Sequence, residues 1–215
     1  MGVGKTEAAL AVAEILAHRF GLGGVFIGLP TQATADGMFA RILKWANRLE
    51  LTAPNSVHLA HGRAQMNEAF AEMTRDAYSR AVRRKYGHGG ESPEELAITH
   101  NWFGSPPKRG PLANLVIGTI DQALFGALRS KHLMLRHLAL AGKVVILDEV
   151  HAYDAFTGQY LERLLHWLGA YEVPVIMLSA TLPAAKRRAF VQAYDDGGGT
   201  SGRADDVPAQ SRAER

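Results

Sequence analysis

Two short segments, far apart in the sequence, carry residue types that bind a nucleoside triphosphate. Residues 2–6 read Gly-Val-Gly-Lys-Thr, and Asp148 and Glu149 directly follow the apolar run Val144–Leu147. In a phosphate loop, glycines let backbone N–H groups turn toward the phosphates, and the positive end of the following helix faces the same charge. An acidic strand end supplies the carboxylates for magnesium and water. Together the two segments predict one ATP–magnesium site.

Within the loop, Lys5 is expected to bind the β- and γ-phosphates, and Thr6 is expected to offer its hydroxyl to Mg²⁺. The alternative is a glycine-rich helix start in which the Lys-Thr pair occurs by chance. We favour the phosphate loop because a helical pattern begins directly after it, as the motif requires. The full cofactor-binding segment of the loop is Gly2, Val3, Gly4, Lys5, Thr6 and Glu7.

The acidic pair should stand at the carboxyl end of a buried strand, where open α/β sheets bind their ligands. Asp148 is placed to hold magnesium through a water, so that Thr6 and Asp148 are the candidate metal-binding residues. Glu149 is placed to orient and deprotonate the attacking water, and with Lys5 and Asp148 it completes the candidate catalytic set. The alternative is that these acids only cap the helix predicted from residue 155.

The elements that must position these residues alternate along the chain. Apolar runs predict strands at residues 25–29, 57–60, 115–118, 144–147 and 175–178, and helical spacing is found at 5–19, 31–49, 64–86, 120–129, 132–140 and 155–170. This alternation implies right-handed βαβ crossovers and a mostly parallel sheet with helices on both faces. We predict one α/β domain over residues 1–194 and a disordered tail over residues 195–215, which lack apolar periodicity.

Composition limits the classes of protein that remain. The chain has 215 residues, of which 47% are hydrophobic and 21% charged, as in ordinary globular domains. The net charge of +3 permits a nucleic-acid partner but does not argue for one. Cysteine is absent, which excludes disulfides and thiolate metal sites and fits a cytoplasmic protein. No apolar run is long enough to cross a bilayer, and no export signal is visible, so no membrane partner is expected.

Longer strings around these motifs resemble a known family. Asp148-Glu149-Val150-His151 is similar to the second motif of superfamily 2 helicases, and Ser179-Ala180-Thr181 is similar to the third. Residues 29–39 (Leu-Pro-Thr-Gln-Ala-Thr-Ala-Asp-Gly-Met-Phe), 118–124 (Gly-Thr-Ile-Asp-Gln-Ala-Leu) and 147–154 (Leu-Asp-Glu-Val-His-Ala-Tyr-Asp) resemble the CRISPR-associated helicase–nuclease of type I systems. The likeness runs from Met1 to about Tyr194 and covers the first RecA-like lobe of that family.

The resemblance implies a RecA-like P-loop NTPase domain that uses ATP and Mg²⁺. It implies ATP-driven movement along single-stranded DNA during antiviral defence, together with a crRNA-guided surveillance complex. Ser179 and Thr181 would lie near the nucleotide and couple its turnover to lobe movement, although both are also typical caps for a helix starting near Ala184. The residues implied in nucleic-acid contacts are Thr31, Gln32, Thr119, Gln122 and His151, and turn or cap chemistry is the alternative for the threonines and glutamines.

Three features of the family plan are not found in the sequence. No His-Asp pair occurs, so an HD nuclease is expected to be absent. The second RecA-like lobe, with the arginine that would complete ATP hydrolysis, is also expected to be absent. The strand that should lead into the phosphate loop is also missing, and we hypothesise that Met1 is an internal methionine of a longer reading frame. For the isolated chain we therefore expect weak or lost nucleotide binding and negligible DNA-stimulated hydrolysis. Two alternatives stay open: another superfamily 2 DNA or RNA helicase, and a catalytically inactive fragment.

Two basic clusters have no assigned role. One consists of Arg80, Arg83, Arg84 and Lys85, and the other of Lys186, Arg187 and Arg188. Either cluster is a solvated helix face or a contact with DNA, and the solvated face is the more common outcome for a run of charges.

Overall fold

Five parallel strands form the centre of the molecule. The structure is a computed structural model that describes residues 4–48, 56–75, 107–128 and 132–200. The strands are β1 (Gly24–Leu29), β2 (Val57–Ala60), β3 (Leu115–Thr119), β4 (Lys143–Leu147) and β5 (Val175–Met177), and their order in the sheet is β2-β3-β1-β4-β5. Every neighbouring pair is parallel. The predicted α/β class with a parallel sheet is confirmed.

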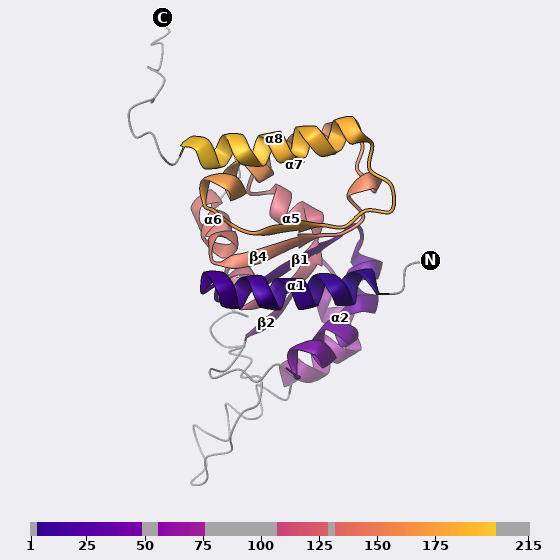
Figure 1. Cartoon of the computed structure of the whole chain (residues 1–215). Helices are drawn as coiled ribbons and strands as arrows, with labels where there is room; N and C mark the ends of the chain where they lie inside the picture. The colour runs from indigo at the N-terminus through magenta and orange to yellow at the C-terminus, as the bar shows by residue number, and fades with distance from the viewer. Residues whose placement is uncertain (1–3, 49–55, 76–106, 129–131, 201–215) are drawn as a thin grey trace, which may run out of the picture.

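Helices cover both faces of this sheet (Figure 1). One face carries α1 (Lys5–Phe20) and α2 (Gln32–Ala46), and the other carries α5 (Ile120–Leu124), α6 (Leu133–Ala141) and α7 (Ala155–Ala170), with α8 (Ala184–Thr200) packed on α7. Short 3₁₀ turns occupy Ala64–Met66, Pro107–Leu112 and Val150–Ala152, and residues 68–75 are helical. The predicted helix at 120–129 is therefore shorter than expected, and residues 76–86 of another lie outside the described part.

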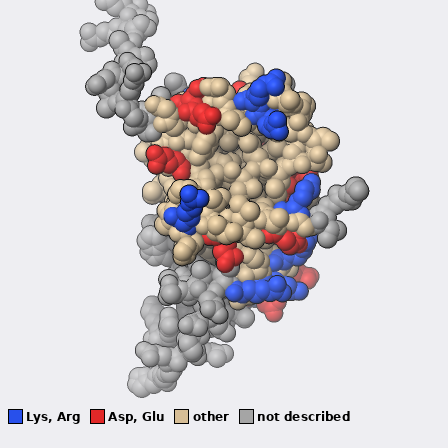
Figure 2. All heavy atoms as spheres, viewed as in Figure 1, with Lys and Arg blue, Asp and Glu red and all other residues tan. Residues whose placement is uncertain are grey.

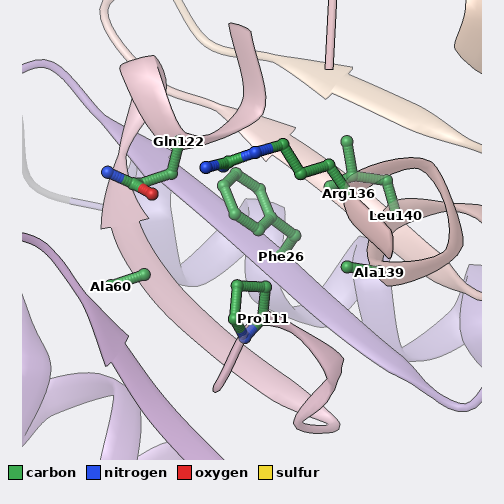
Figure 3. Close-up of a pocket in the computed structure, with 7 residues that line it drawn as sticks. All are labelled: Phe26, Ala60, Pro111, Gln122, Arg136, Ala139 and Leu140. Atoms are coloured by element: carbon green, nitrogen blue, oxygen red, sulfur yellow. The ribbon is translucent and has the colours of Figure 1, made fainter. Parts of the chain in front are cut away.

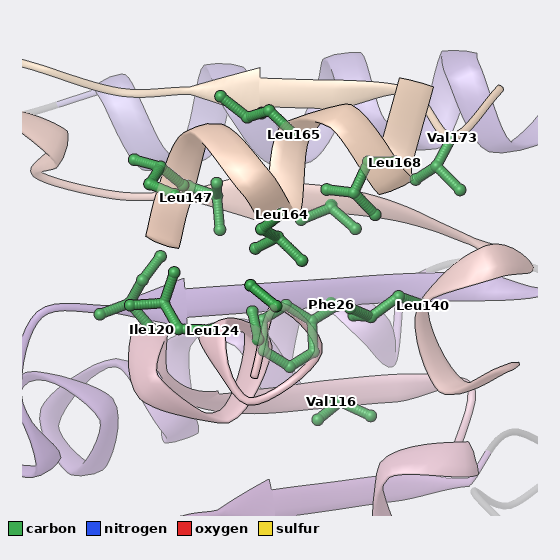
Figure 4. Close-up of a cluster of buried hydrophobic side chains, with 14 of the residues drawn as sticks. Phe26, Val116, Ile120, Leu124, Leu140, Leu147, Leu164, Leu165, Leu168 and Val173 are labelled. Carbon is green, nitrogen blue, oxygen red and sulfur yellow. The ribbon is translucent and has the colours of Figure 1, made fainter. Parts of the chain in front are cut away.

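Strand alternation divides the core into two clusters. On β1, Phe26 faces α5, α6 and α7, whereas Val25 and Ile27 face α1 and α2. Figure 4 shows Leu164 and Leu168 of α7 above Phe26 in the first cluster. Strands β3 and β4 are buried along their full length, as expected for a parallel sheet covered on both faces.

Local sequence signals set the ends of α1 and the starts of α2 and α7. Gly4 precedes α1 with a φ of 101°, and Gly21 ends α1 with a φ of 63°, a region that favours glycine. Thr31 begins α2 through a capping box with Thr34, because each backbone N–H is bonded by the other residue's hydroxyl. Asp154 caps α7 by accepting from the Thr157 N–H at 2.7 Å.

Helix α8 continues to Thr200, beyond the domain boundary predicted at Tyr194. The difference arises from tertiary packing that composition does not reveal. Gly169 of α7 and Gly197 of α8 let the two helix backbones approach closely, since a Cβ atom at Gly197 would collide with the backbone oxygen of His166. Residues 195–200 thus belong to the helical pair rather than to a tail, and residues 201–215 lie outside the described part.

A half-buried histidine on β2 should make the fold sensitive to acid. Burial and, to a smaller extent, the charge of His61 lower the pKa of His58 to about 4. In the unfolded chain the pKa of this histidine is near 6.5. Between about pH 6.5 and 4, the unfolded chain therefore binds a proton at His58 that the folded chain does not bind. The free energy of unfolding should be unaffected by this histidine above about pH 6.5, and it should fall by about 3 kcal/mol as the pH approaches 4. Urea unfolding across this pH range measures the loss.

A His58→Leu variant should remove most of that pH dependence, whereas His18→Gln, a change at an exposed position on α1, should leave it intact. If the free energy of unfolding depended on pH equally in the wild type and in His58→Leu, the assignment would be wrong.

None of the helices in the described ranges is both long and apolar enough to traverse a bilayer.

Candidate nucleotide site

The first turn of α1 meets the end of β4. The Nζ atom of Lys5 lies 4.0 Å from Oε1 of Glu149, although the two residues are far apart in the sequence. Thr6 stands in the same helical turn and is half-buried. Because α1 starts at the carboxyl edge of the sheet, its free N–H groups and its dipole are directed at the space beside the acidic pair. Gly2 and Val3 lie outside the described residues.

Two neighbouring segments hold the backbone of the acidic strand end. The Asp148 N–H donates to the carbonyl of Gly28 on β1 at 2.9 Å, and the Val150 N–H donates to the carbonyl of Leu178 after β5 at 3.0 Å. Between them, Glu149 adopts a left-handed conformation with a φ of 53°. A non-glycine residue in this region is uncommon and carries some strain. The turn aims Glu149 back toward Lys5.

Burial is the main influence on the Asp148 carboxyl group. It raises the pKa of Asp148, and the neighbouring charge of Glu149 adds to this effect. The N–H of Glu149, which donates to Oδ1 of Asp148 at 2.8 Å, and the charges of Lys5 and His151 act in the opposite direction. A partly desolvated carboxylate beside a cation suits a second cation, since metal binding would relieve the unfavourable burial of negative charge.

The donor set fits Mg²⁺ held partly by a nucleotide. In the described ranges, no group of three or more His, Cys, Asp or Glu side chains is arranged to hold a metal ion. Mg²⁺ does not require such a cage, because it keeps several waters and binds through one or two carboxylates together with substrate phosphates. The Asp148 carboxylate and the Thr6 hydroxyl are the residues that would hold it.

Glu7 has a partner that the sequence did not reveal. Its carboxylate forms an ion pair with the guanidinium of Arg41 on α2. The pKa of Glu7 is lowered, first by its own backbone N–H at the helix start and then by Arg41. Both side chains are more than half exposed, so the pair adds little stability. The Glu7 side chain is thus directed toward α2, and no sequence pattern links residues so far apart.

His151 joins the acidic strand end to the segment after β5. Its Nδ1 atom lies 3.1 Å from Oε2 of Glu149 and 3.3 Å from Oγ of Ser179, and it accepts from the Ala180 N–H at 3.4 Å. The second and third motifs therefore meet at one histidine. Thr181 is exposed, and the Ser179 hydroxyl faces His151.

The other implied nucleic-acid residues occupy different environments. Thr31 and Gln32 are exposed at the start of α2, where the Thr31 hydroxyl also serves the capping box. Thr119 is buried, with only 6% of its surface exposed. Gln122 lines a small pocket on the α5 and α6 face, beside Arg136 and above Phe26 (Figure 3). Of this set, the structure thus leaves Thr31, Gln32 and His151 exposed, whereas Thr119 is buried and Gln122 lines the pocket.

Asp148→Asn is expected to stabilise the fold while weakening metal binding. The raised pKa means that the ionised carboxylate is less favourable in the folded state than in the unfolded state at neutral pH. An uncharged amide removes this penalty, and its oxygen still accepts from the Glu149 N–H. The melting temperature should rise by about 1–3 °C. Calorimetric melting without ligand measures this; a lower melting temperature would contradict it.

Comparison with known proteins gives consistent matches over the whole described domain. The sequence profile of the DEAD/DEAH box helicase family matches residues 1–189. The CRISPR-associated nuclease/helicase Cas3 of Streptococcus thermophilus is 44% identical over 205 residues, which are 94% of this chain and 21% of that protein. The crystal structure of T. fusca Cas3-ATP is 39% identical, covers 100% of this chain and 21% of its own, and superposes with a TM-score of 0.76.

A further solved structure, of a CRISPR RNA-guided surveillance complex before nicking, contains a similar chain. It is 37% identical, covers 93% of this chain and 17% of its own, and has a TM-score of 0.62. The chain spans about one fifth of the length of the relatives that it matches. The similarity therefore concerns one domain of much longer proteins.

Proposed function

Because the chain belongs to the DEAD/DEAH box helicase family, we propose that its RecA-like domain is the first motor lobe of an ATP-driven DNA translocase in CRISPR defence. One observation supports this most directly: Lys5, at the start of α1, lies 4.0 Å from Glu149 at the end of β4. The residues to which we assign phosphate binding and water activation therefore lie close to one another at the carboxyl edge of the sheet.

In this proposal, the Lys5 ammonium binds the β- and γ-phosphates of ATP, and the N–H groups that open α1 face the same charge. Asp148 and Thr6 would hold Mg²⁺, which supplies charge neutralisation at the phosphates when bound. The Lys5–Glu149 pair is roughly one-third exposed on each side, so breaking it costs at most about 1 kcal/mol. Lys5 can therefore move to a phosphate and leave Glu149 free.

Glu149 then orients the attacking water and accepts its proton. The left-handed turn at this residue directs the carboxylate into the space beside Lys5, and its second oxygen lies 3.1 Å from Nδ1 of His151. Since His151 also contacts Ser179 and the Ala180 N–H, a change at Glu149 reaches the segment that follows β5. This contact gives a route from nucleotide state to lobe movement.

For partners, we propose single-stranded DNA and a crRNA-guided surveillance complex. The support for the complex is the similarity to a chain in a solved surveillance complex. For DNA, the exposed start of α2 with Thr31 and Gln32 offers polar groups at the carboxyl edge. The face in Figure 2 carries acidic and basic side chains intermixed rather than one basic field, so contacts with the DNA backbone would be local.

A steady-state ATPase assay with single-stranded DNA tests how much of the motor this domain contains. We expect negligible turnover by the chain alone, because charge in the transition state of phosphoryl transfer needs donors from two lobes. Robust DNA-stimulated turnover would contradict this expectation. A domain that binds no nucleotide under any condition would favour the alternative of a catalytically inactive fragment.

A further inference from the structure

Lys186, at the start of α8, is not a freely solvated cation. Its Nζ atom donates to the backbone carbonyl of Tyr153 at 2.8 Å and lies 5.8 Å from the ring centroid of Phe190. The side chain is half-buried, and its stem passes within van der Waals distance of where a Cβ atom at Gly158 would stand. Lys186 therefore holds the segment between β4 and α7, whereas Arg187 and Arg188 remain exposed.

Tyr153, whose backbone Lys186 binds, also contacts the acidic strand end through its side chain. Its phenol donates to the backbone carbonyl of Asp148 at 2.9 Å, and its ring packs against the buried cluster under α7. Burial raises the pKa of Tyr153, and the charges of Asp148, Asp121 and Glu149 raise it further. The phenol thus stays protonated at neutral pH, where it acts as a hydrogen-bond donor.

The carbonyl that Tyr153 binds belongs to the peptide group between Asp148 and Glu149. That peptide has no other hydrogen bond from a neighbouring strand within the described residues: its N–H is used by the Asp148 carboxylate, and its carbonyl is used by the phenol. The orientation of this one peptide sets both the direction of the Asp148 carboxylate and the left-handed turn at Glu149. A strained turn persists only where surrounding groups hold it.

We propose that Tyr153 is a positioning residue for the nucleotide site, and that Lys186 holds Tyr153 in place. This inference rests on the proposed function of Asp148 and Glu149, and it extends the site to α8. Neither Tyr153 nor Lys186 touches the nucleotide; both act through the peptide between Asp148 and Glu149. The alternative is that the two hydrogen bonds only stabilise the fold.

Tyr153→Phe separates these readings when it is compared with a matched control, Tyr194→Phe. The Tyr194 phenol also donates to a backbone carbonyl, that of Val173, at 2.8 Å, but it lies in the α7–α8 pair away from the acidic strand end. Both variants lose one phenol-to-carbonyl hydrogen bond and keep the ring. A fold-only role predicts similar losses of melting temperature and no other difference.

The first readout is nucleotide affinity by calorimetric titration, with Mg–ATP and with ATP in EDTA. We expect Tyr153→Phe to weaken Mg–ATP binding by about five- to tenfold, the effect of one misplaced charged ligand group. Metal-free ATP, held through Lys5, should bind as in the wild type. Tyr194→Phe should change neither affinity. Equal affinities in the two variants would overturn the positioning role.

The second readout needs no ligand. Amide hydrogen exchange at Glu149 and Val150, followed by NMR, should be faster in Tyr153→Phe and in Lys186→Met, unchanged in Tyr194→Phe, and restored in Lys186→Arg. If exchange at Glu149 is the same in all these variants, the proposal is wrong. Absence of ATP binding by the wild-type chain would contradict the proposed function but not the role of Tyr153. The exchange experiment would still decide whether Tyr153 positions the strand end.

Discussion

Lys5→Ala is expected to lower the affinity of the chain for Mg–ATP by about 10- to 100-fold. This range corresponds to one charge-assisted interaction with a phosphate, or roughly 1.5–3 kcal/mol. The variant should have little effect on folding, because Lys5 is partly exposed and, among the described residues, its one ion pair is a weak contact with Glu149. Titration with a fluorescent ATP analogue measures the two affinities.

Lys44→Ala is the matched control for this experiment. Lys44 is an exposed lysine in the last turn of α2, and its removal changes the net charge by the same amount. It should leave the affinity unchanged. If both lysine variants weakened binding equally, general electrostatic attraction would explain the result, and the phosphate-loop assignment would lose its support.

The second large effect concerns hydrolysis and requires a longer polypeptide that contains both motor lobes. In that context Glu149→Gln is expected to lower kcat by about 10²- to 10⁴-fold, the usual contribution of a general base. Nucleotide affinity should be kept or slightly improved. The glutamine no longer offers a carboxylate to Lys5, so the lysine is free to bind the phosphates.

Single-turnover kinetics with saturating Mg–ATP separates the chemical step from binding. Glu14→Gln, on the exposed face of α1, serves as the control and should leave kcat unchanged. A Glu149→Gln enzyme that retained most of its turnover would show that another group activates the water, and the role of the acidic strand end would then be confined to metal binding.

The central part of the fold could be predicted because buried parallel strands are local, continuous apolar runs. The run Val144–Leu147 is such a segment, and β4 is buried along its full length. The proximity of Lys5 and Glu149 also follows from the sequence, since a phosphate loop and an acidic strand end both belong at the carboxyl edge of a parallel sheet. The order of the strands in the sheet could not be predicted from the sequence, because strand register and the choice of crossover depend on tertiary packing.

The contacts that sequence reasoning missed all join residues without a shared pattern. Arg41 contacts Glu7 because α2 packs beside α1, and Lys186 contacts Tyr153 because α8 packs along α7. A run of charges predicts a solvated helix face. In the cluster Lys186, Arg187 and Arg188 this holds for the two arginines, whereas Lys186 is half-buried and contacts Tyr153. The length of α8 was missed for a related reason: residues 195–200 lack apolar periodicity in the sequence, but in the structure Gly197 permits a close helix–helix approach.

A crystal structure of this chain with Mg²⁺ and a non-hydrolysable ATP analogue tests the central claim most directly. We expect the β- and γ-phosphates beside the Lys5 ammonium, and the metal would be held by the Thr6 hydroxyl and the Asp148 carboxylate. Glu149 should have left Lys5 and should face the γ-phosphate. A nucleotide bound elsewhere, or bound without contact to either Lys5 or Asp148, would contradict the account.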